Sequence, residues 1–503
     1  MKPAHLLHAL IALVPAVMRA DVRLPAVISH HMVLQRDAVV PVWGWADPGE
    51  QVAVAFAGQT RTAVAAADGA WRVTLDPLRA SDTGATLTIS GNNRIVIEDV
   101  LVGEVWLGSG QSNMAMTVAR SLDPEREATA ANHPRIRFFK ETSASATTPQ
   151  KIGKGEWVLC SPQTAPAASA VLYFFGREVH QKLGVPVGLI NSSVGGTPIE
   201  SWIAPEAQRA TKELAPFFAA MKAEAAAIDS PAARKKYEAD LAAWEAGQKA
   251  AKAAKKKAAK KPQDPAELAA RKADVGGLFN GKIAPLIPYA VRGFLWYQGE
   301  ANSTPGKAPF YAAQLRLLVT DWRGRWGAEL PFAWAQLPNF TGAGRDWPAV
   351  REAMLQTLAL PRTGMGINLD IGEANDIHPR NKKEAGRRLA LWALGEVYNE
   401  KVPATSGPLP AGHEIRGAAI TLRFMHTNGG LVAKDGVLRG FEIAGDDRVW
   451  RPAQARLAGD TVIVTSAEVP RPVAARYAWE NNPAASLFNG AGLPATPFRT
   501  ERW

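Results

Sequence analysis

One short stretch limits the possible folds of this chain more than any other. The apolar residues Val105-Trp106-Leu107 favour a buried strand, and they end at the turn Gly108-Ser109-Gly110. Glycine allows a sharp turn where a Cβ atom would clash, so the nearby Ser112 can be held at the end of this strand. The stretch therefore predicts a strand, a tight turn and one positioned hydroxyl group.

Ser112 can act as a nucleophile only if a base lies near it, usually a histidine oriented by a carboxylate. Serine is common in loops, so a turn serine that caps the next helix is the alternative. Asp376 and His378 supply a candidate pair between the apolar segment 364–369 and the helical pattern of residues 383–398. A capping aspartate and a structural loop histidine are the alternatives for this pair.

Two further apolar segments end in residues that can donate hydrogen bonds to an oxyanion. Residues 290–297 are followed by Gln298-Gly299-Glu300-Ala301-Asn302, and residues 185–194 by Gly195-Gly196-Thr197-Pro198. Acyl transfer needs donors directed at the developing negative charge, and a glycine N–H or an amide side chain can supply them. Alternatively, the glycines only turn the chain and Gln298 only ties two loops together.

The pattern of strands, helices and turns divides the chain into three folded parts. Its 503 residues exceed the size at which a single core keeps growing. Residues 21–100 predict an N-terminal β-sandwich accessory domain, and residues 403–503 a C-terminal β-rich region. Between them, residues 101–402 alternate strands and helices, which predicts a three-layer α/β/α core with a mostly parallel sheet.

The expected elements can be stated by residue range. The N-terminal strands are 39–45, 51–57, 60–65, 71–75, 86–90 and 95–98; the clearer helices are 174–183 and 308–322; the C-terminal strands are 419–424, 440–444 and 461–465.

The excess positive charge is concentrated in one alanine-rich segment. The formal net charge is +11, and residues 231–275 hold 12 Lys/Arg and 6 Asp/Glu, or 12 − 6 = +6. Such composition predicts a surface insertion at about 230–275, helical or partly irregular. Binding to an anionic surface or polysaccharide is the alternative. No aromatic residues alternate with the lysines as single-stranded nucleic acid would require, so no nucleic-acid partner is expected.

Residues 1–20 have the pattern of a signal peptide. Lys2 precedes the apolar stretch 6–17, and Ala20 lies near the expected cleavage site. No other stretch is long and apolar enough to span a bilayer, and the single Cys160 allows no internal disulfide. We therefore expect a secreted or periplasmic protein with no transmembrane segment.

The sequence contains no pattern typical of a metal or cofactor site. There is no H-E-x-x-H, paired-cysteine, phosphate-loop or dinucleotide motif. We expect no metal and no cofactor, and the sequence carries no signal of the oligomeric state.

Several motifs occur in one characteristic order. They are G-S-G-Q-S-N-M at 108–114, F-N-G-K-I-A-P-L at 279–286, W-Y-Q-G-E-A-N at 296–302 and D-I-H-P at 376–379. The segments M-V-L-Q at 32–35, P-V-W-G-W-A at 41–46 and P-F-R-T at 497–500 add to them. Together they resemble the sialate O-acetylesterase family of the SGNH (GDSL-like) hydrolases. The resemblance runs from about Leu24 to the C-terminus and is interrupted by the insertion.

The resemblance implies roles for particular residues. Ser112 would be the nucleophile, His378 the general base and Asp376 the carboxylate that orients the imidazole. The oxyanion hole would consist of the backbone N–H groups of Ser112 and Gly195 with the side chain of Gln298.

Two departures from the superfamily pattern leave alternatives for these roles. The superfamily usually has D-x-x-H where this chain has D-x-H, and it has an asparagine after glycine where this chain has Gln298 and Glu300. Glu300 is therefore an alternative orienting carboxylate, and Asn302 an alternative oxyanion donor.

We expect the sugar to be bound by residues around the same loops. Aromatic faces pack on sugar C–H groups, although core packing is the more frequent fate of a tryptophan. An arginine can pair with a substrate carboxylate or form a structural ion pair. The candidate substrate-binding residues are Gln111, Asn113, Trp202, Glu300, Asn302 and Arg351, with Trp296 and Trp347 also near the loops.

These residues lead to one predicted activity with two alternatives. The prediction is a secreted serine esterase that removes O-acetyl groups from a sugar or glycan, with sialic acid as the substrate that the resemblance implies. An acetylxylan or hemicellulose esterase is possible on the same scaffold, because only the ester carbonyl meets the serine. A non-catalytic carbohydrate-binding protein is the second alternative.

Overall fold

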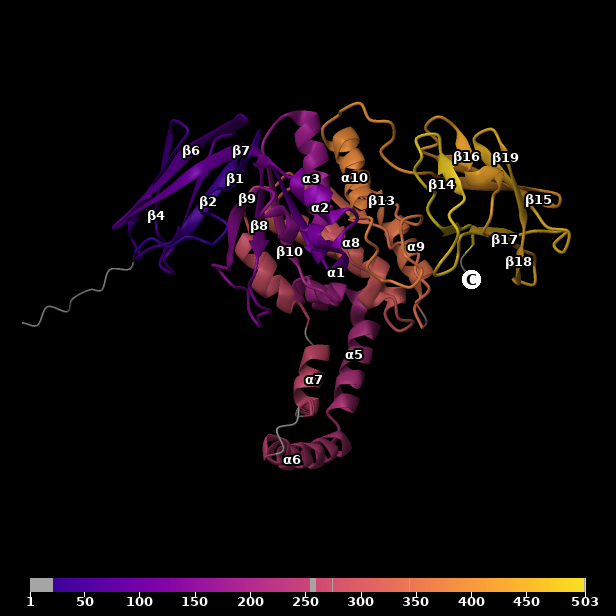
Figure 1. The fold of residues 1–503 in the computed structure, drawn as a ribbon, viewed down its shortest axis with the longest axis horizontal. Helices are drawn as coiled ribbons and strands as arrows, with labels where there is room; N and C mark the ends of the chain where they lie inside the picture. The colour runs from indigo at the N-terminus through magenta and orange to yellow at the C-terminus, as the bar shows by residue number, and fades with distance from the viewer. Residues whose placement is uncertain (1–20, 254–258, 274, 343, 502) are drawn as a thin grey trace, which may run out of the picture.

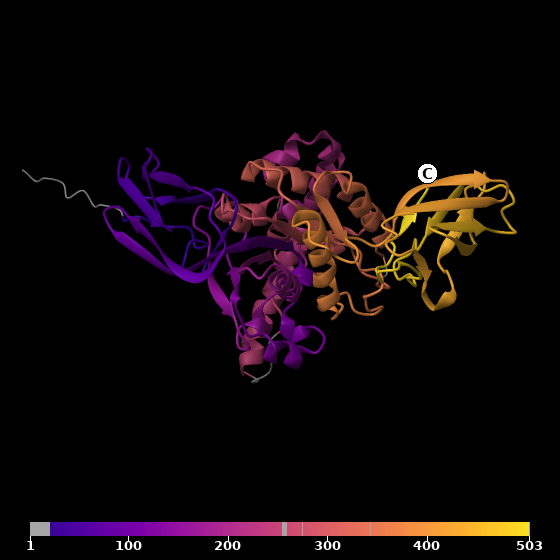
Figure 2. The ribbon, with the colours of Figure 1, turned by 90° about the horizontal axis from the view of Figure 1, so that it is seen from above.

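The computed structural model describes residues 21–253, 259–273, 275–342, 344–501 and 503. Residues 1–20, for which a signal peptide is predicted, lie outside this described part. Figure 1 shows an N-terminal β region on the left, an α/β part in the middle and a C-terminal β region on the right. Figure 2 shows the same row from above. The mixed α/β architecture expected from the sequence is confirmed.

A mostly parallel sheet forms the centre of the molecule. Its strand order is β13-β12-β11-β7-β10-β8-β9, and all neighbours are parallel except the antiparallel pair β8 and β9. These strands are β7 (Arg94–Gly110), β8 (His133–Glu141), β9 (Gly155–Cys160), β10 (Val187–Ser193), β11 (Gly293–Tyr297), β12 (Phe332–Ala335) and β13 (Thr363–Gly366).

Helices cover both faces of this sheet. Helices α3 (Ala170–Leu183) and α10 (Lys382–Trp392) lie on one face, and α8 (Tyr311–Trp326) and α9 (Trp347–Thr357) lie on the other. Along β11, Phe294 and Trp296 join the core under α8, whereas Leu295 and Tyr297 join the core under α3 and α10. Burial on both faces explains why this strand is apolar throughout rather than alternating.

The ends of the predicted helices differ from the observed ends for local reasons. Helix α3 begins at Ala170 rather than at residue 174, because the Ser169 hydroxyl accepts a hydrogen bond from the Leu172 N–H and caps the helix. The predicted helix 308–322 is a 3₁₀ turn at Ala308–Phe310 followed by α8. The helix predicted for 383–398 is α10 followed by a π-helical turn, Ala393–Val397.

The N-terminal β region shares its last strand with the central sheet. Residues 95–98, predicted as a separate strand, belong to the 17-residue strand β7, which continues to Gly110. The predicted boundary at 100–101 therefore lies inside a strand. Asp99 has a positive φ of 56° and the pairing with β6 is irregular nearby. The other strands are β1 (Val33–Gln35), β2 (Val40–Trp45), β3 (Gln51–Phe56), β4 (Gln59–Val64), β5 (Ala70–Leu75) and β6 (Ser81–Ser90).

The C-terminal β region contains two four-stranded sheets and one two-stranded sheet. Its strands are β14 (Leu409–Arg416), β15 (Ala419–Met425), β16 (Leu431–Ala433), β17 (Phe441–Ala444), β18 (Trp450–Pro452), β19 (Gln454–Ala458), β20 (Thr461–Thr465), β21 (Ala474–Tyr477), β22 (Leu487–Asn489) and β23 (Phe498–Arg499). The three strands predicted here correspond to β15, β17 and β20.

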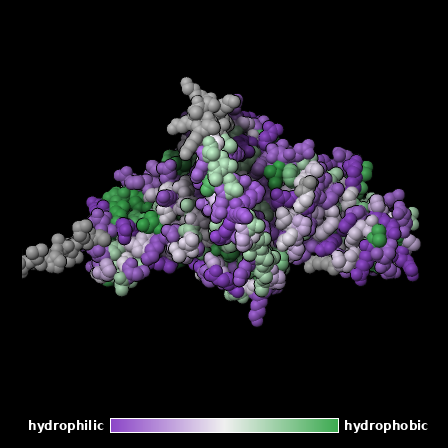
Figure 3. All heavy atoms as spheres, turned by 90° about the horizontal axis from the view of Figure 1, so that it is seen from below, coloured by the Kyte–Doolittle hydropathy of each residue, from purple (hydrophilic) through white to green (hydrophobic). Residues whose placement is uncertain are grey.

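A helical arm projects from the α/β part at the position of the predicted insertion (Figure 1). It consists of α5 (Ala215–Ile228), α6 (Pro231–Ala253) and α7 (Pro265–Lys272). The arm therefore begins before residue 230. The sequence did not mark α5 as part of the insertion because its single lysine, Lys222, is balanced by Glu224. Figure 3 shows hydrophilic and mixed residues over most of the face seen from below. The largest strongly hydrophobic cluster lies over the N-terminal β region on the left, and smaller ones lie elsewhere.

Short helical turns complete the chain. The short helices are α1 (Ser112–Ala115), α2 (Pro124–Thr129) and α4 (Pro205–Ala210). Single 3₁₀ turns occur at Val118–Arg120, Ala165–Ala167, Ile199–Ser201, Lys212–Leu214, Ala284–Leu286, Glu300–Asn302 and Lys434–Gly436, and a π-helical turn occurs at Phe279–Ile283. Within the part that the structure describes, no helix has the length and apolar character needed to cross a bilayer.

Arg351 on α9 joins the α/β part to the C-terminal β region. Its side chain is fully buried, and its guanidinium donates hydrogen bonds to four backbone carbonyl groups. Two acceptors, Leu337 and Pro338, follow β12, and two, Glu480 and Asn481, follow β21. The one side chain therefore fixes two loops from different parts of the chain.

We expect Arg351→Met to lower the free energy of unfolding by about 2–4 kcal/mol, because it leaves buried carbonyl groups without donors. Arg416→Met, which changes an exposed arginine on β14, is the matched control and should have little effect. Thermal unfolding followed by circular dichroism measures both variants. Equal melting temperatures for wild type and Arg351→Met would contradict the assignment.

Candidate active site

The register of the central sheet brings three loops together at one edge. Gly110, the last residue of β7, pairs with Ser193 on β10 and with Tyr297 on β11. Ser112 and Gly195 each follow two residues after their strand ends, so they reach the same place. Gly110 has a φ of +135°, and a Cβ there would lie 2.2 Å from the Tyr297 carbonyl oxygen. Only glycine fits this approach, as the turn in the sequence predicted.

Ser112 and His378 are in hydrogen-bond contact. The Oγ of Ser112 lies 2.7 Å from Nε2 of His378, which stands on the loop after β13. Ser112 is the first residue of helix α1, where backbone N–H groups have no acceptor within the helix. Gly195 lies directly beside it, since a Cβ on Gly195 would be 3.5 Å from the Ser112 Cβ. The arrangement can activate a hydroxyl group and place N–H donors next to it.

Asp376 approaches His378 without a hydrogen bond to its ring. One oxygen, Oδ1, accepts a hydrogen bond of 2.8 Å from the His378 backbone N–H and lies 3.8 Å from Nδ1. The latter distance exceeds that of a hydrogen bond, and the Asp376 side chain is 56% exposed. Asp376 therefore holds the loop and acts on the ring through its charge.

The alternative carboxylate, Glu300, has a different partner. Its Oε1 accepts a hydrogen bond of 2.5 Å from the Asn113 side chain, and the residue is only 2% exposed. Asn113 also donates to the Ile377 carbonyl at 3.0 Å and accepts a bond of 2.6 Å from the Lys382 ammonium. Asn113 thus ties the turn of the nucleophile to the loop of the histidine.

Burial shifts the pKa values of the titratable groups in this cluster. Burial lowers the pKa of His378, partly opposed by the charge of Asp376. It lowers the pKa of Lys382 to about 7 and raises the pKa of the Glu300 carboxyl. The environment disfavours charge on each group. The lowered pKa of His378 favours its neutral form, which can accept a proton.

The side chain of Gln298 forms its hydrogen bonds within the protein. It is fully buried, and its Nε2 lies 3.2 Å from Gln111 Oε1, 3.2 Å from the Thr197 carbonyl oxygen and 2.7 Å from Asn302 Oδ1. Its Oε1 accepts a hydrogen bond of 3.0 Å from the Tyr311 hydroxyl. The amide thus ties loops together, which was the alternative to its prediction as an oxyanion donor.

The residues predicted to bind the sugar are buried in this structure. All six candidates are at most 3% exposed, so none presents a surface to a ligand in this structure. Trp202 packs on Trp296, and its indole donates to the Thr197 hydroxyl at 3.0 Å. Asn302 donates to Glu200 at 2.8 Å. The six are Gln111, Asn113, Trp202, Glu300, Asn302 and Arg351, and Trp296 and Trp347 are equally buried.

Sequence reasoning missed Lys382. This residue lies in the first turn of α10, where the helix dipole disfavours a cation, and it is almost completely buried. A lysine at that position, four residues after His378, was a usable signal. Among the residues that the structure describes, no group of three or more His, Cys, Asp or Glu is placed to hold a metal ion.

Comparison with known proteins identifies similar chains. A family profile described as "Carbohydrate esterase, sialic acid-specific acetylesterase" matches residues 102–233 and 281–393. A carbohydrate acetylesterase from Xanthomonas citri is 35% identical, with a TM-score of 0.81 over 96% of this chain and 100% of that one. The sialate O-acetylesterases of Rattus norvegicus and Homo sapiens are each 27% identical over 95% of this chain, covering 94% and 92% of theirs.

We expect Lys382→Met to raise the pKa of His378, because the Lys382 charge is one of the influences that lower it. Histidine-selective NMR across pH measures this pKa, with the signal assigned by its loss in His378→Asn. Lys383→Met is the matched control, since Lys383 pairs with Glu127 instead. A pKa that is unchanged or lower in Lys382→Met would contradict the electrostatic role of this lysine.

Proposed function

This chain belongs to the sialate O-acetylesterase family of carbohydrate esterases, and we propose that it removes O-acetyl groups from sialic acid with Ser112 as its nucleophile. It is a carboxylic ester hydrolase. The observation that carries the proposed mechanism is the 2.7 Å contact between Ser112 Oγ and His378 Nε2. This geometry suits transfer of the hydroxyl proton to a neutral imidazole.

The first half of the reaction forms an acetyl-enzyme. Ser112 Oγ attacks the acetyl carbonyl carbon while His378 Nε2 takes the hydroxyl proton. The carbonyl oxygen becomes an oxyanion, for which the backbone N–H groups of Ser112 and Gly195 are the proposed donors. The sugar oxygen then leaves with the proton from His378, and the acetyl group stays on Ser112.

The second half repeats these steps with water. His378 takes a proton from the water molecule as it attacks the acetyl carbonyl, and Ser112 leaves with that proton. Acetate is released and the free enzyme is restored. Asp376 stabilises the imidazolium that forms twice in each cycle, through its charge across 3.8 Å.

The proposal of sialic acid as substrate is supported by the family and by the names of the relatives. The same chemistry would deacetylate xylan or another hemicellulose, since only one oxygen of the sugar belongs to the bond that breaks. Export of the enzyme is part of the proposal and is supported by the pattern of residues 1–20 in the sequence.

Acetate release tests the proposed function directly. Wild type should release acetate from O-acetylated sialic acid faster than from acetylated xylan, and Ser112→Ala should release none from either. Faster release from acetylated xylan would mean that xylan, and not sialic acid, is the preferred substrate. Release that survives in Ser112→Ala would exclude this serine as the nucleophile. Absence of release from both sugars by the wild type would contradict the proposed function.

We expect Asp376→Asn to lower kcat/KM by about 10–100-fold and His378→Ala by about 10⁴-fold or more. The difference follows from the geometry, because Asp376 is exposed and makes no hydrogen bond to the imidazole ring. Steady-state kinetics on one acetyl ester measures both variants. Equal losses in the two variants would mean that Asp376 bonds the ring during turnover.

A further inference from the structure

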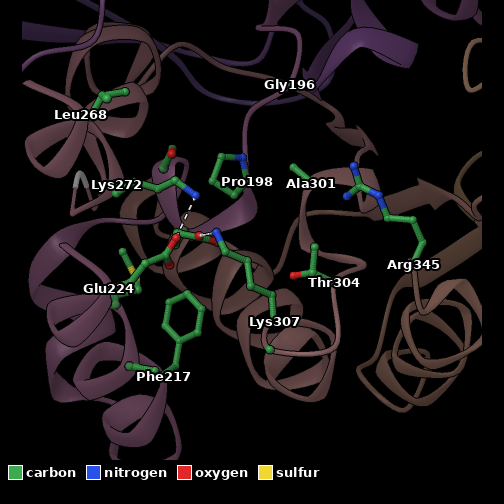
Figure 4. Close-up of a pocket in the computed structure, with 15 residues that line it drawn as sticks. Gly196, Pro198, Phe217, Glu224, Leu268, Lys272, Ala301, Thr304, Lys307 and Arg345 are labelled. Atoms are coloured by element: carbon green, nitrogen blue, oxygen red, sulfur yellow. Dashed lines mark hydrogen bonds and ion pairs between the residues drawn. The ribbon is translucent and has the colours of Figure 1, made fainter. Parts of the chain in front are cut away.

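A pocket of about 740 Å³ lies between the helical arm and the loops of the active site (Figure 4). We call it the arm pocket. One wall is the turn after β10, a second is the loop after β11, and a third comes from α5 and α7 of the arm. Its volume is in the range of pockets that hold small ligands. Its lining includes Gly196, Ala301, Arg345, Met221, Leu268 and Lys272.

The arm pocket begins beside the nucleophile. Gly196 in its wall directly follows Gly195, which lies against Ser112. Ala301 in its opposite wall donates its backbone N–H to Gln111 Oε1 at 3.1 Å, and Gln111 precedes Ser112 in the chain. The arm pocket therefore extends to loop residues next to those that contact Ser112.

Only one of the cations in this pocket lacks a carboxylate partner. Lys272 pairs with Glu224 at 3.0 Å, and Lys307 pairs with Glu200 at 2.6 Å, as the dashed lines in Figure 4 mark. Arg345 forms no ion pair with any carboxylate in the described residues, although its charge acts on the buried Glu300 carboxyl. Its Nη1 donates to the Glu300 backbone carbonyl at 2.9 Å. The other guanidinium nitrogens remain available to an anion.

Arg345 is held in place before any ligand arrives. Asn481 of the C-terminal β region donates its side-chain N–H to the Arg345 backbone carbonyl at 3.2 Å. The bond to the Glu300 carbonyl fixes the other end of the side chain. In Figure 4 the guanidinium extends from the right-hand wall toward Ala301. An anchored arginine loses little side-chain entropy when it binds a carboxylate.

The arm supplies an apolar wall opposite this arginine. Leu268 on α7 presents apolar surface to the pocket. Phe217 and Met221 on α5 also line it but are largely buried, and Figure 4 shows the Phe217 ring at its lower side. Apolar and aromatic side chains pack against the C–H groups of a sugar ring. The pocket thus combines one free cation with an apolar surface.

We propose that the arm pocket binds the acidic part of an O-acetylated sugar, with Arg345 pairing with its carboxylate and the arm packing against the ring. This inference rests on the proposed function. Arg345 then has the role that the sequence suggested for Arg351, whose guanidinium is used within the protein. The arm is a specificity element that selects acidic over neutral acetylated sugars.

A matched pair of substrates isolates the carboxylate. O-acetylated sialic acid and its methyl ester carry the same acetyl group, and the ester replaces the carboxylate with a neutral group that is one methyl larger. Wild type should favour the free acid by about 10–100-fold in kcat/KM, mainly through KM, because a charge-assisted hydrogen bond is lost in the ester. Arg345→Gln should bring the ratio close to one, and Arg345→Lys should restore part of it.

The control Arg416→Gln, on the exposed strand β14, should keep the wild-type ratio. A wild-type ratio near one, or a ratio that Arg345→Gln leaves unchanged, would overturn the inference while the proposed function stands. If wild type releases acetate from neither acetylated sugar, the proposed function itself fails and the inference falls with it. Near-native circular dichroism of Arg345→Gln ensures that a change in ratio reports on binding.

A second variant tests the arm. Ala220 on α5 is exposed and lines the pocket, so Ala220→Trp fills it without changing the core. We expect kcat/KM on the acetylated sugar acid to fall at least tenfold relative to p-nitrophenyl acetate. Ala219→Trp, one position away and outside the lining, is the matched control. Equal kinetics for the two tryptophan variants would exclude the arm as a wall of the substrate site.

Discussion

The pairing of β7 with β10 on one side and β11 on the other determines where Ser112 and the proposed oxyanion donors lie. Gly110 stands level with Ser193 and Tyr297, so the three loops that follow meet at one point of the sheet edge. Since β7 also forms part of the N-terminal β region, that region is built on the strand that presents Ser112. Gly110 allows this arrangement, because any side chain there would collide with the Tyr297 carbonyl.

Beneath the reactive pair lies a buried polar support rather than an apolar one. Asn113 connects Glu300, Lys382 and the loop of His378, and Gln298 connects Gln111 with Asn302. Buried polar groups that are paired in this way fix a single geometry, and each unpaired one would destabilise the fold. Burial also lowers the pKa of the His378 imidazole, because it disfavours the charged form. The same buried surroundings therefore position Ser112 and His378 and lower the pKa of the base.

The strand ends, the three-layer core and the residues that meet at the sheet edge could be predicted from the sequence. Strand patterns and glycine turns depend on neighbouring residues in the chain, so they can be recognised without the fold. The sequence did not separate the residues that touch a ligand from those that hold the loops. Asn302 and Arg351 have side chains suited to either role, and only the packing decides. The continuity of β7 was missed because Asp99 interrupts its apolar pattern, and α5 lacks the charge that marked the insertion.

Covalent labelling tests the central claim, that Ser112 is the nucleophile activated by His378. The enzyme is treated with an organophosphate that phosphorylates activated serines, and the modified peptide is identified by mass spectrometry. One phosphoryl group on Ser112 in the wild type, with labelling lost in His378→Ala, is the result that this account predicts. Labelling of a different residue, or of Ser112 at the same rate without His378, would contradict it.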